Sequence, residues 1–204
     1  MTIHPLTLDD ISDQRAYERE RDEFRRQVIA VKRLRRVAIG PVVTLTFESR
    51  LTMRFQVQEM ARAEKLTTDA QIQQELDVYN RLLPAPGELS ATLFLELTTE
   101  EQLRTWLPRL VGIERSLLLE IGEGAGRHLV RSVPEEEHDA QLTRAEVTSA
   151  VHYVRFPFSP AATVAFRSGP VRLVIDHGEY PEGRPGVELS PATLDELAGD
   201  LLGS

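Results

Sequence analysis

The sequence has no cysteine among its 204 residues and very little lysine. Without thiols the chain cannot form a disulfide, bind zinc through thiolates, hold a cysteine-ligated iron–sulfur cluster or use a cysteine nucleophile. Lys32 and Lys65 stand beside 22 arginines, a ratio that we interpret as genomic base composition rather than as a guanidinium-specific function. The hydrophobic content of 41% is still enough for a real core, so we expect a soluble globular domain.

Long apolar runs are absent as well. No stretch approaches the roughly 18–20 residues that a membrane helix needs. The segment from Met1 to Ser12 carries Asp9 and Asp10 but no basic residue, because the first one is Arg15. It therefore lacks the basic start and the apolar run of a signal peptide. We expect a cytoplasmic protein.

Charge is distributed unevenly along the chain, whose formal net charge is −8. Between Arg15 and Arg36 nine basic residues accompany four acidic ones, a net charge of +5 that leaves −13 for the rest. From Asp176 to Ser204 seven acids accompany one base. The basic segment supplies the candidates for nucleic-acid binding: Arg25, Arg26, Lys32, Arg33, Arg35 and Arg36. Acids interrupt its first half and no aromatic platform accompanies it. A solvated face, open to an acidic partner, is the better interpretation, and nucleic-acid binding is unlikely.

Hydrophobic periodicity and turn residues divide the chain into helices and strands. A long basic N-terminal helix is expected from a Thr7 cap to the residues before Gly40, and further helices over 51–66, 70–79, 99–110, 160–166 and 191–202. Strands are expected over 42–48, 91–97, 116–121, 127–133, 149–158 and 171–177. We therefore predict an α+β (mixed) fold with a central, largely antiparallel or mixed sheet of about six strands and flanking helices. Residues 1–180 would form a single domain, and 181–204 a linker and C-terminal helix or tail.

Two segments resemble binding motifs but lack the required context. The glycine-rich run from Gly122 to Gly126 precedes an expected strand rather than a helix, and Glu123 within it would repel phosphate. A hairpin turn is the better interpretation. The acidic run from Glu135 to Asp139 offers oxygen ligands, yet it lacks the glycine and the ligand spacing of an EF-hand loop. We expect a solvated loop there.

Two histidines lie within apolar strands, where a polar side chain needs a specific partner. His152 alternates with Val154 and Phe156, and His177 ends the next expected strand. Each can be a hydrogen-bonded core or strand-end residue. Alternatively, both meet in one pocket as metal ligands or as acid–base groups. Antiparallel neighbouring strands would let them meet, whereas a parallel crossover would leave them at opposite ends of the sheet.

A carboxylate could complete such a site. Glu59 lies in a polar cluster with Arg50, Arg54 and Arg62, for most of which we expect surface ion pairs, because the Glu-x-x-His pair of di-iron helices is absent. His152, His177 and Glu59 form a possible carboxylate and imidazole set for iron, manganese or zinc.

Seven segments together resemble a known family. They are Arg36–Pro41, Phe47–Arg50, Gln56–Met60, Glu75–Asn80, Gly112–Glu114, Ser149–Phe156 and Asp176–Tyr180. From about Leu6 to Tyr180 the chain resembles a bacterial family of unknown function, the domain-of-unknown-function family three-five-zero-one, whereas the tail after Pro181 has no counterpart in this resemblance.

The resemblance also implies a setting. Members are often encoded beside rubrerythrin-like and heterodisulfide-reductase-like iron–sulfur proteins, which implies a role near peroxide or iron redox chemistry and oxidative stress, with such a redox protein as partner. The matching segments contain the binding candidates that this resemblance suggests: Arg50, Glu59, His152, Arg155, Asp176, His177 and Tyr180.

Three functions compete. The first is a cytoplasmic accessory protein of that redox system, which docks a partner or holds a small ligand or metal. The second is an enzyme that uses His152 and His177 as acid–base groups or metal ligands and Arg50 or Arg155 to hold a small anionic substrate. Both histidines and Glu59 around one concave pocket would favour the enzyme, and separated, packed histidines would favour the binding protein. The third, nucleic-acid binding through the basic helix, requires a strongly salt-dependent affinity for a duplex.

Overall fold

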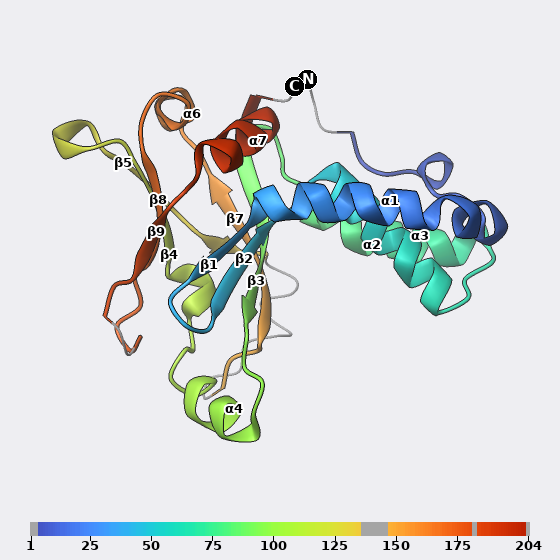
Figure 1. Cartoon of the computed structure of the whole chain (residues 1–204), viewed down its shortest axis with the longest axis horizontal. Helices are drawn as coiled ribbons and strands as arrows, with labels where there is room; N and C mark the ends of the chain where they lie inside the picture. Colours follow the sequence, from blue (N-terminus) through green and yellow to red (C-terminus); the bar gives the residue numbers. More distant parts are fainter. Residues whose placement is uncertain (1–3, 136–146, 181–182, 203–204) are drawn as a thin grey trace.

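The computed structural model describes residues 4–135, 147–180 and 183–202 (Figure 1). Its helices are α1 (Gln14–Arg35), α2 (Arg50–Ala63), α3 (Asp69–Tyr79), α4 (Glu100–Trp106), α6 (Pro160–Phe166) and α7 (Pro191–Leu202), and its short 3₁₀ turns are η1 (Leu8–Asp10), η2 (Asn80–Leu82), η3 (Ile113–Arg115) and η4 (Gly124–Gly126). Its strands are β1 (Arg36–Ile39), β2 (Val43–Phe47), β3 (Glu88–Leu95), β4 (Leu117–Ile121), β5 (His128–Arg131), β6 (Val133–Pro134), β7 (Val151–Pro157), β8 (Val171–Ile175) and β9 (Gly186–Glu188). Most of the acidic run from Glu135 to Asp139, for which a solvated loop was expected, lies outside the described residues.

The strands form two antiparallel sheets. Sheet A has the order β1-β2-β3-β7-β6, and sheet B has the order β5-β4-β8-β9. The predicted α+β class and antiparallel pairing are confirmed, but the strands are divided between two sheets instead of forming one central sheet. The hairpin predicted at Gly122–Gly126 joins β4 to β5, with Ile121 opposite His128.

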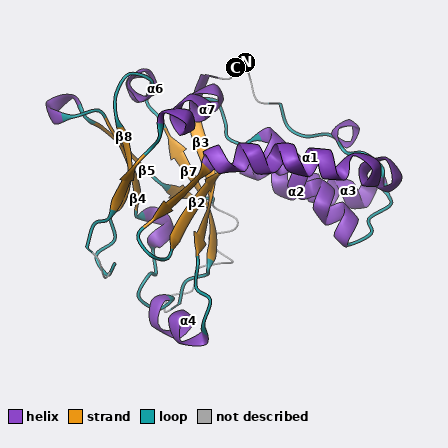
Figure 2. Cartoon of the chain, viewed as in Figure 1, coloured by secondary structure: helices purple, strands orange, loops and turns teal. Residues whose placement is uncertain are grey.

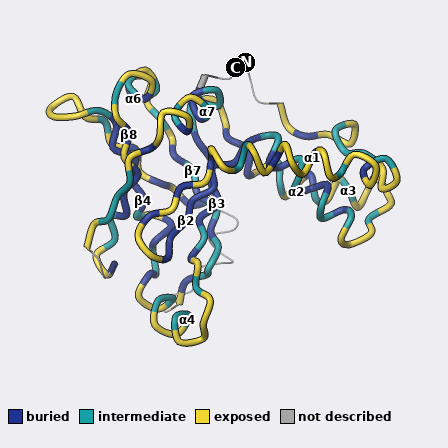
Figure 3. The backbone as a smooth tube through the Cα atoms, in the orientation of Figure 1, coloured by how far each residue is buried: buried dark blue, intermediate teal, exposed yellow. Residues whose placement is uncertain are grey.

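Apolar residues of the two sheets share one core. Leu45, Leu93 and Phe156 of sheet A are fully buried in the same cluster as Leu119 and Leu173 of sheet B. Figure 3 shows the central strands β2, β3 and β4 largely in dark blue, and β2 is buried at every position. Each such side chain contributes about 1.5–3 kcal/mol through burial, so this core holds the two sheets together.

Helices α1, α2 and α3 form a helical arm that projects from the sheets (Figures 1 and 2). Tyr17, Phe24 and Val28 of α1 pack against Leu51 and Phe55 of α2. The other side of α2 packs on α3 in a second cluster: Leu6, Met53, Val57, Leu76, Leu82 and Leu83. Because each helix buries an apolar stripe against its neighbour, the arm has a core of its own.

The N-terminal helix is present but shorter than predicted at both ends. Thr7 caps only the turn η1, through a capping box with Asp10, and α1 begins after Asp13, whose side chain accepts a hydrogen bond from Ala16. α1 ends at Arg35 because the next four residues pair with β2 as an edge strand. Over the described residues, no helix has the length and apolar content to cross a bilayer.

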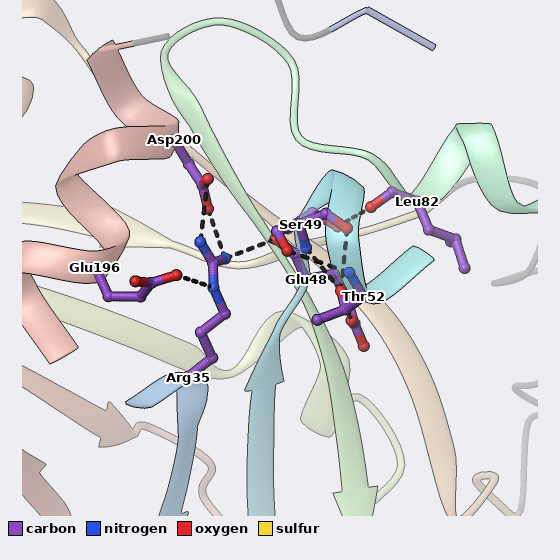
Figure 4. A network of polar contacts seen from close by, with 8 residues as sticks. Arg35, Glu48, Ser49, Thr52, Leu82, Glu196 and Asp200 are labelled. Carbon is purple, nitrogen blue, oxygen red and sulfur yellow. Dashed lines mark hydrogen bonds and ion pairs between the residues drawn. The ribbon is translucent and has the colours of Figure 1, made fainter. Parts of the chain in front are cut away.

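Arg35, the last residue of α1, joins the arm to α7 (Figure 4). Its Nε lies 2.8 Å from Glu196 Oε1, and its Nη1 lies 2.7 Å from Asp200 Oδ2. Nη1 also donates to Glu48 O at 3.2 Å. The Arg35 side chain is only 4% exposed, so Arg35 does not belong among the candidates for nucleic-acid binding. A guanidinium can be buried here because three acceptors replace its water.

The C-terminal segment is packed into the body. Leu197, Ala198 and Leu201 of α7 belong to the core between the sheets, and β9 pairs with β8 in register Val187 opposite Leu173. The predicted C-terminal helix is therefore present, and the short strand β9, which the sequence did not predict, precedes it.

Gly186 offers a test of how closely β9 is packed. A Cβ there would lie 2.8 Å from Arg172 Nε and 2.9 Å from Val174 Cγ2. We expect Gly186→Ala to lower the free energy of unfolding by about 1–3 kcal/mol, since overpacking forces neighbours to shift, as measured by urea denaturation. Gly178→Ala is the matched control, because its Cβ would meet nothing within 4 Å. Equal stability of the two variants would contradict this packing.

Candidate ligand-binding site

At the tip of the helical arm α1 and α3 begin and α2 ends (Figure 1). A cleft of about 320 Å³ opens between these helix ends. Its apolar lining comes from Leu8, Ile11, Ala61, Leu66 and Ile72, and its charged rim from Asp13, Arg15, Arg62 and Asp69. We call this feature the tip cleft. An apolar hollow with a few polar groups at its edge is the usual form of a small-molecule site.

The turn after α2 shapes one wall of the tip cleft. Leu66 N–H donates to Ala61 O at 2.9 Å, and Lys65 N–H donates to Arg62 O at 3.4 Å. These are the two bonds of a Schellman C-cap, which folds Leu66 back toward Ala61. Lys65 has a φ of 56°, a left-handed conformation that costs a lysine about 1–2 kcal/mol. The backbone hydrogen bonds thus hold this wall in place despite the unfavourable left-handed conformation of Lys65.

The charged rim has both signs. Asp13 is occupied by its N-cap bond to Ala16 (2.9 Å), and Arg62 Nε donates to Glu18 at 2.6 Å. Within the described part of the chain, the side chains of Arg15 and Asp69 form neither a hydrogen bond nor an ion pair. One cation and one anion at the rim are therefore available to the polar groups of a ligand.

A charged network lies beside the tip cleft. Tyr17, which lines the cleft, donates from its hydroxyl to Glu59 Oε1 at 2.6 Å, and Arg21 donates to both Glu59 oxygens at 2.8 Å. The hydrogen bond from Arg21, helped by that from Tyr17, lowers the pKa of Glu59 to about 2. Burial, and then the bond to Glu59, raises the pKa of Tyr17. Glu59 is therefore an ionised carboxylate that links α2 to α1 through hydrogen bonds.

Most of the polar cluster predicted on α2 forms ion pairs within the arm, as expected, whereas Arg54 donates to Asp10 O. Arg50 pairs with Asp10 at 2.7 Å and donates from Nε to His4 O at 3.1 Å. Glu59 pairs with Arg21. Arg50 and Glu59, the two site candidates on α2, thus bind the N-terminal segment and α1, respectively.

His152 is packed inside the body. It lies on β7 of sheet A, opposite Leu93, and is 2% exposed. Its Nε2 lies 2.9 Å from both Ser149 O and Thr148 Oγ1. Because a carbonyl oxygen only accepts, Nε2 carries a proton. This is the hydrogen-bonded core histidine of the first interpretation.

His177 follows the last residue of β8 by two positions. Because β8 belongs to sheet B and β7 to sheet A, the strands nearest the two histidines are not neighbours. Its Nε2 donates to Val111 O at 3.0 Å, and its Nδ1 accepts from Glu179 N–H at 3.3 Å. This pattern is that of a neutral imidazole with both ring nitrogens in use.

The three remaining candidates also have structural contacts. Arg155 of β7 pairs with Glu88 and donates to Leu83 O at 3.3 Å. Tyr180 is 3% exposed, with its ring centroid 5.7 Å from that of Trp106.

Asp176 lies between two arginines at the end of β8. Its Oδ2 pairs with Arg131, and its Oδ1 accepts from Arg184 Nε at 3.1 Å. The hydrogen bond from Arg131, followed by that from Arg184, lowers the pKa of Asp176.

The seven candidates therefore divide among the arm, sheet A and the end of β8. Among the residues that the structure describes, no group of three or more His, Asp or Glu side chains could hold a metal ion. His152, His177 and Glu59 accordingly do not form such a group.

Sequence reasoning missed the tip cleft itself. Its lining comes from five segments: the residues before α1, the start of α1, the end of α2, the turn after α2 and the start of α3. The available signals were the caps: Asp13 before α1 and Thr68 before α3 place two helix starts, but only the packing of α1 and α3 on α2 brings those starts together.

The chain matches the model of one protein family over residues 5–201, a family described as a protein of unknown function, DUF3501. The chain belongs to the DUF3501 family. The match extends through α7, beyond Tyr180, where the resemblance noted in the sequence ends, so the C-terminal segment has a counterpart in the family after all.

This DUF3501 chain is also similar to a novel protein of unknown function from Burkholderia pseudomallei K96243, known from a crystal structure. The two are 37% identical, with a TM-score of 0.86, over 97% of this chain and 100% of that chain. No curated protein matches the chain. With this coverage, the shared fold includes the arm as well as both sheets.

Proposed function

We propose that this DUF3501 protein is an accessory binding protein that holds a small organic ligand in the tip cleft. The volume of about 320 Å³ lies at the lower end of the roughly 300–1,000 Å³ typical of ligand pockets. The ligand would have an apolar body for the lining of Ala61, Leu66 and Ile72 and a polar head for Arg15 and Asp69. The tip cleft is the observation that carries this proposal.

The histidines favour binding over the enzyme hypothesis. His152 is packed in sheet A, His177 lies beyond sheet B, and Glu59 lies in the arm. The histidines are separated, as the binding hypothesis requires; His152 is buried, whereas His177 is half-buried with both ring nitrogens hydrogen-bonded. Arg50 and Arg155, the proposed anion holders, already have the carboxylate partners Asp10 and Glu88.

The family resemblance motivates the finer part of the proposal. It suggests that the protein serves a peroxide or iron redox system in the cytoplasm, beside a rubrerythrin-like or iron–sulfur partner. Because the chain has no cysteine, its contribution would be ligand binding or contact with the partner.

A fragment screen tests the proposed cleft. We expect small organic fragments with an apolar ring and a polar head to bind wild-type protein with a Kd near 1 mM, detected by ligand-observed NMR. Ala61→Leu adds three carbon atoms to the lining and should weaken this binding at least tenfold, since it fills space that the fragment needs.

Ala63→Leu is the matched control, because Ala63 is an exposed residue of the same helix and does not line the cleft. Fragments should bind this variant as they bind wild type. Fragments that bind all three proteins equally, or that bind none of them, would contradict the proposal.

A further inference from the structure

The N-terminal segment, residues 4–12, lies along the arm before α1 begins (Figure 1, dark blue). We call it the strap. Apart from the turn η1 it has no regular secondary structure of its own, so its position depends on side chains of α2 and on Asn80. An extended chain held by another element in this way resembles a bound peptide.

Two amide side chains hold the strap at its ends. Asn80 accepts from Leu6 N–H at 2.7 Å and donates to Leu6 O at 2.9 Å. Gln58 accepts from Ser12 N–H at 3.0 Å and donates to Ser12 O at 2.9 Å. Each amide satisfies both backbone groups of one strap residue, a contact that any amino acid except proline can make at that position.

Two arginines hold the strap between these points. Arg50 Nε donates to His4 O at 3.1 Å, and Arg54 Nε donates to Asp10 O at 2.7 Å. Among the hydrogen bonds and ion pairs that these two arginines make with the strap, the one to the Asp10 carboxylate, from Arg50 at 2.7 Å, involves a strap side chain. The groove side chains therefore bind the strap mainly through its backbone.

Two strap side chains add selectivity. Leu6 is 2% exposed and belongs to the cluster of Met53, Val57 and Leu76. Asp10, four residues after Leu6, forms an ion pair with Arg50. Backbone hydrogen bonds for affinity, with one apolar pocket and one charge for specificity, are the features of a peptide-recognition groove.

We propose that the face of α2 and α3, with Asn80, is a docking groove for an extended segment of a partner protein that carries an apolar residue and, four positions later, a carboxylate. The strap occupies this groove in the free chain. Exchange of straps between two copies is less suitable, because the strap ends at Ser12, directly before the α1 cap Asp13, and exchange would force two arm tips together. The contact of Gln58 with Ser12 borders the tip cleft. The proposal goes beyond that cleft, since the contacts of the strap with Asn80 and Arg50 lie outside its lining.

Peptide binding to the full chain tests the proposal. The probe is a fluorescent peptide with the sequence of residues 4–13, measured by anisotropy. The tethered strap competes at a high effective concentration, so the wild-type chain should bind the peptide weakly. The variant Leu6→Ala/Asp10→Asn weakens the strap without altering the groove and should bind the peptide at least tenfold more tightly than wild type.

A groove change should act in the opposite direction. Adding Asn80→Ala to that strap variant should reduce peptide affinity at least tenfold, and a peptide with the Leu6→Ala and Asp10→Asn changes should bind weakly to every variant. If the double strap variant does not fold, Asp10→Lys serves instead, because it places a cation beside Arg50.

The proposal is overturned if a folded strap variant binds no more tightly than wild type, or if the Asn80 change has no effect. A wild-type dimer in analytical ultracentrifugation that becomes monomeric in the strap variant would also overturn it, in favour of strap exchange between copies. Fragment binding in the tip cleft is measured separately, so each proposal can fail without the other.

Discussion

Replacing Arg35 with methionine is expected to lower the free energy of unfolding by about 3 kcal/mol or more. The folded protein encloses the guanidinium between Glu196 and Asp200, whose side chains are 29% and 13% exposed. Methionine fits the space but leaves two carboxylates facing each other, together with Glu48 O, without a cation. Guanidinium chloride denaturation, followed by circular dichroism, measures the loss.

Arg36→Met is the matched control for this prediction. Arg36 follows Arg35 directly but is exposed, with a surface ion pair to Glu96, so its loss should cost less than about 1 kcal/mol. Replacing Arg35, Glu196 and Asp200 together with apolar residues should recover much of the stability, because the uncompensated charges are then gone. If Arg35→Met is as stable as the control, the ion cluster does not anchor the arm.

Glu59→Gln is expected to remove about 1–2 kcal/mol of stability at pH 7 and to flatten the acid limb of the stability profile. The pKa of Glu59 falls from an ordinary value of 4.5 to about 2 in the folded protein. A lowered pKa contributes stability that is complete above about pH 5 and is lost as the pH falls toward 2. The expected loss of free energy is smaller than the full pKa shift of Glu59 would give, because its side chain is 25% exposed.

Denaturation midpoints measured between pH 7 and pH 2 check this prediction. Wild type should lose stability over that window more steeply than Glu59→Gln. Glu101→Gln, at an exposed position of α4, should follow wild type throughout. Parallel profiles for wild type and Glu59→Gln would show that Tyr17 and Arg21 do not depend on this charge.

Local signals in the sequence located most of the elements. Ser49 and Thr68 accept hydrogen bonds from the first turns of α2 and α3, and Gly122 and Gly124 adopt positive φ in the hairpin loop. The edge strand β1 was missed because its residues, from Arg36 to Ile39, continue a helical pattern and become a strand only through pairing with β2. The division into two sheets depends on such long-range pairing, which local periodicity does not contain.

The candidate site could be predicted only in part. Residue type indicated that most of the charged side chains of α2 form ion pairs, and alternation made a hydrogen-bonded core residue one of the two interpretations of His152. The burial of Arg35 could not be foreseen, because its partners lie more than 160 positions away, at Glu196 and Asp200. The strap was equally hidden: Asn80 and Gln58 have nothing in their local sequence that indicates a backbone ligand.

The order of synthesis gives the contact between Arg35 and α7 a further consequence. A chain emerges from the ribosome N-terminus first, and its domains generally fold as units. Arg35 is made before its partners, because Glu196 and Asp200 follow it 161 and 165 residues later. Until they emerge, the charge at the base of the arm has no carboxylate partner there and must stay hydrated. A product truncated before Glu196 would keep an exposed, unanchored arm, so this contact can close only after α7 has been made.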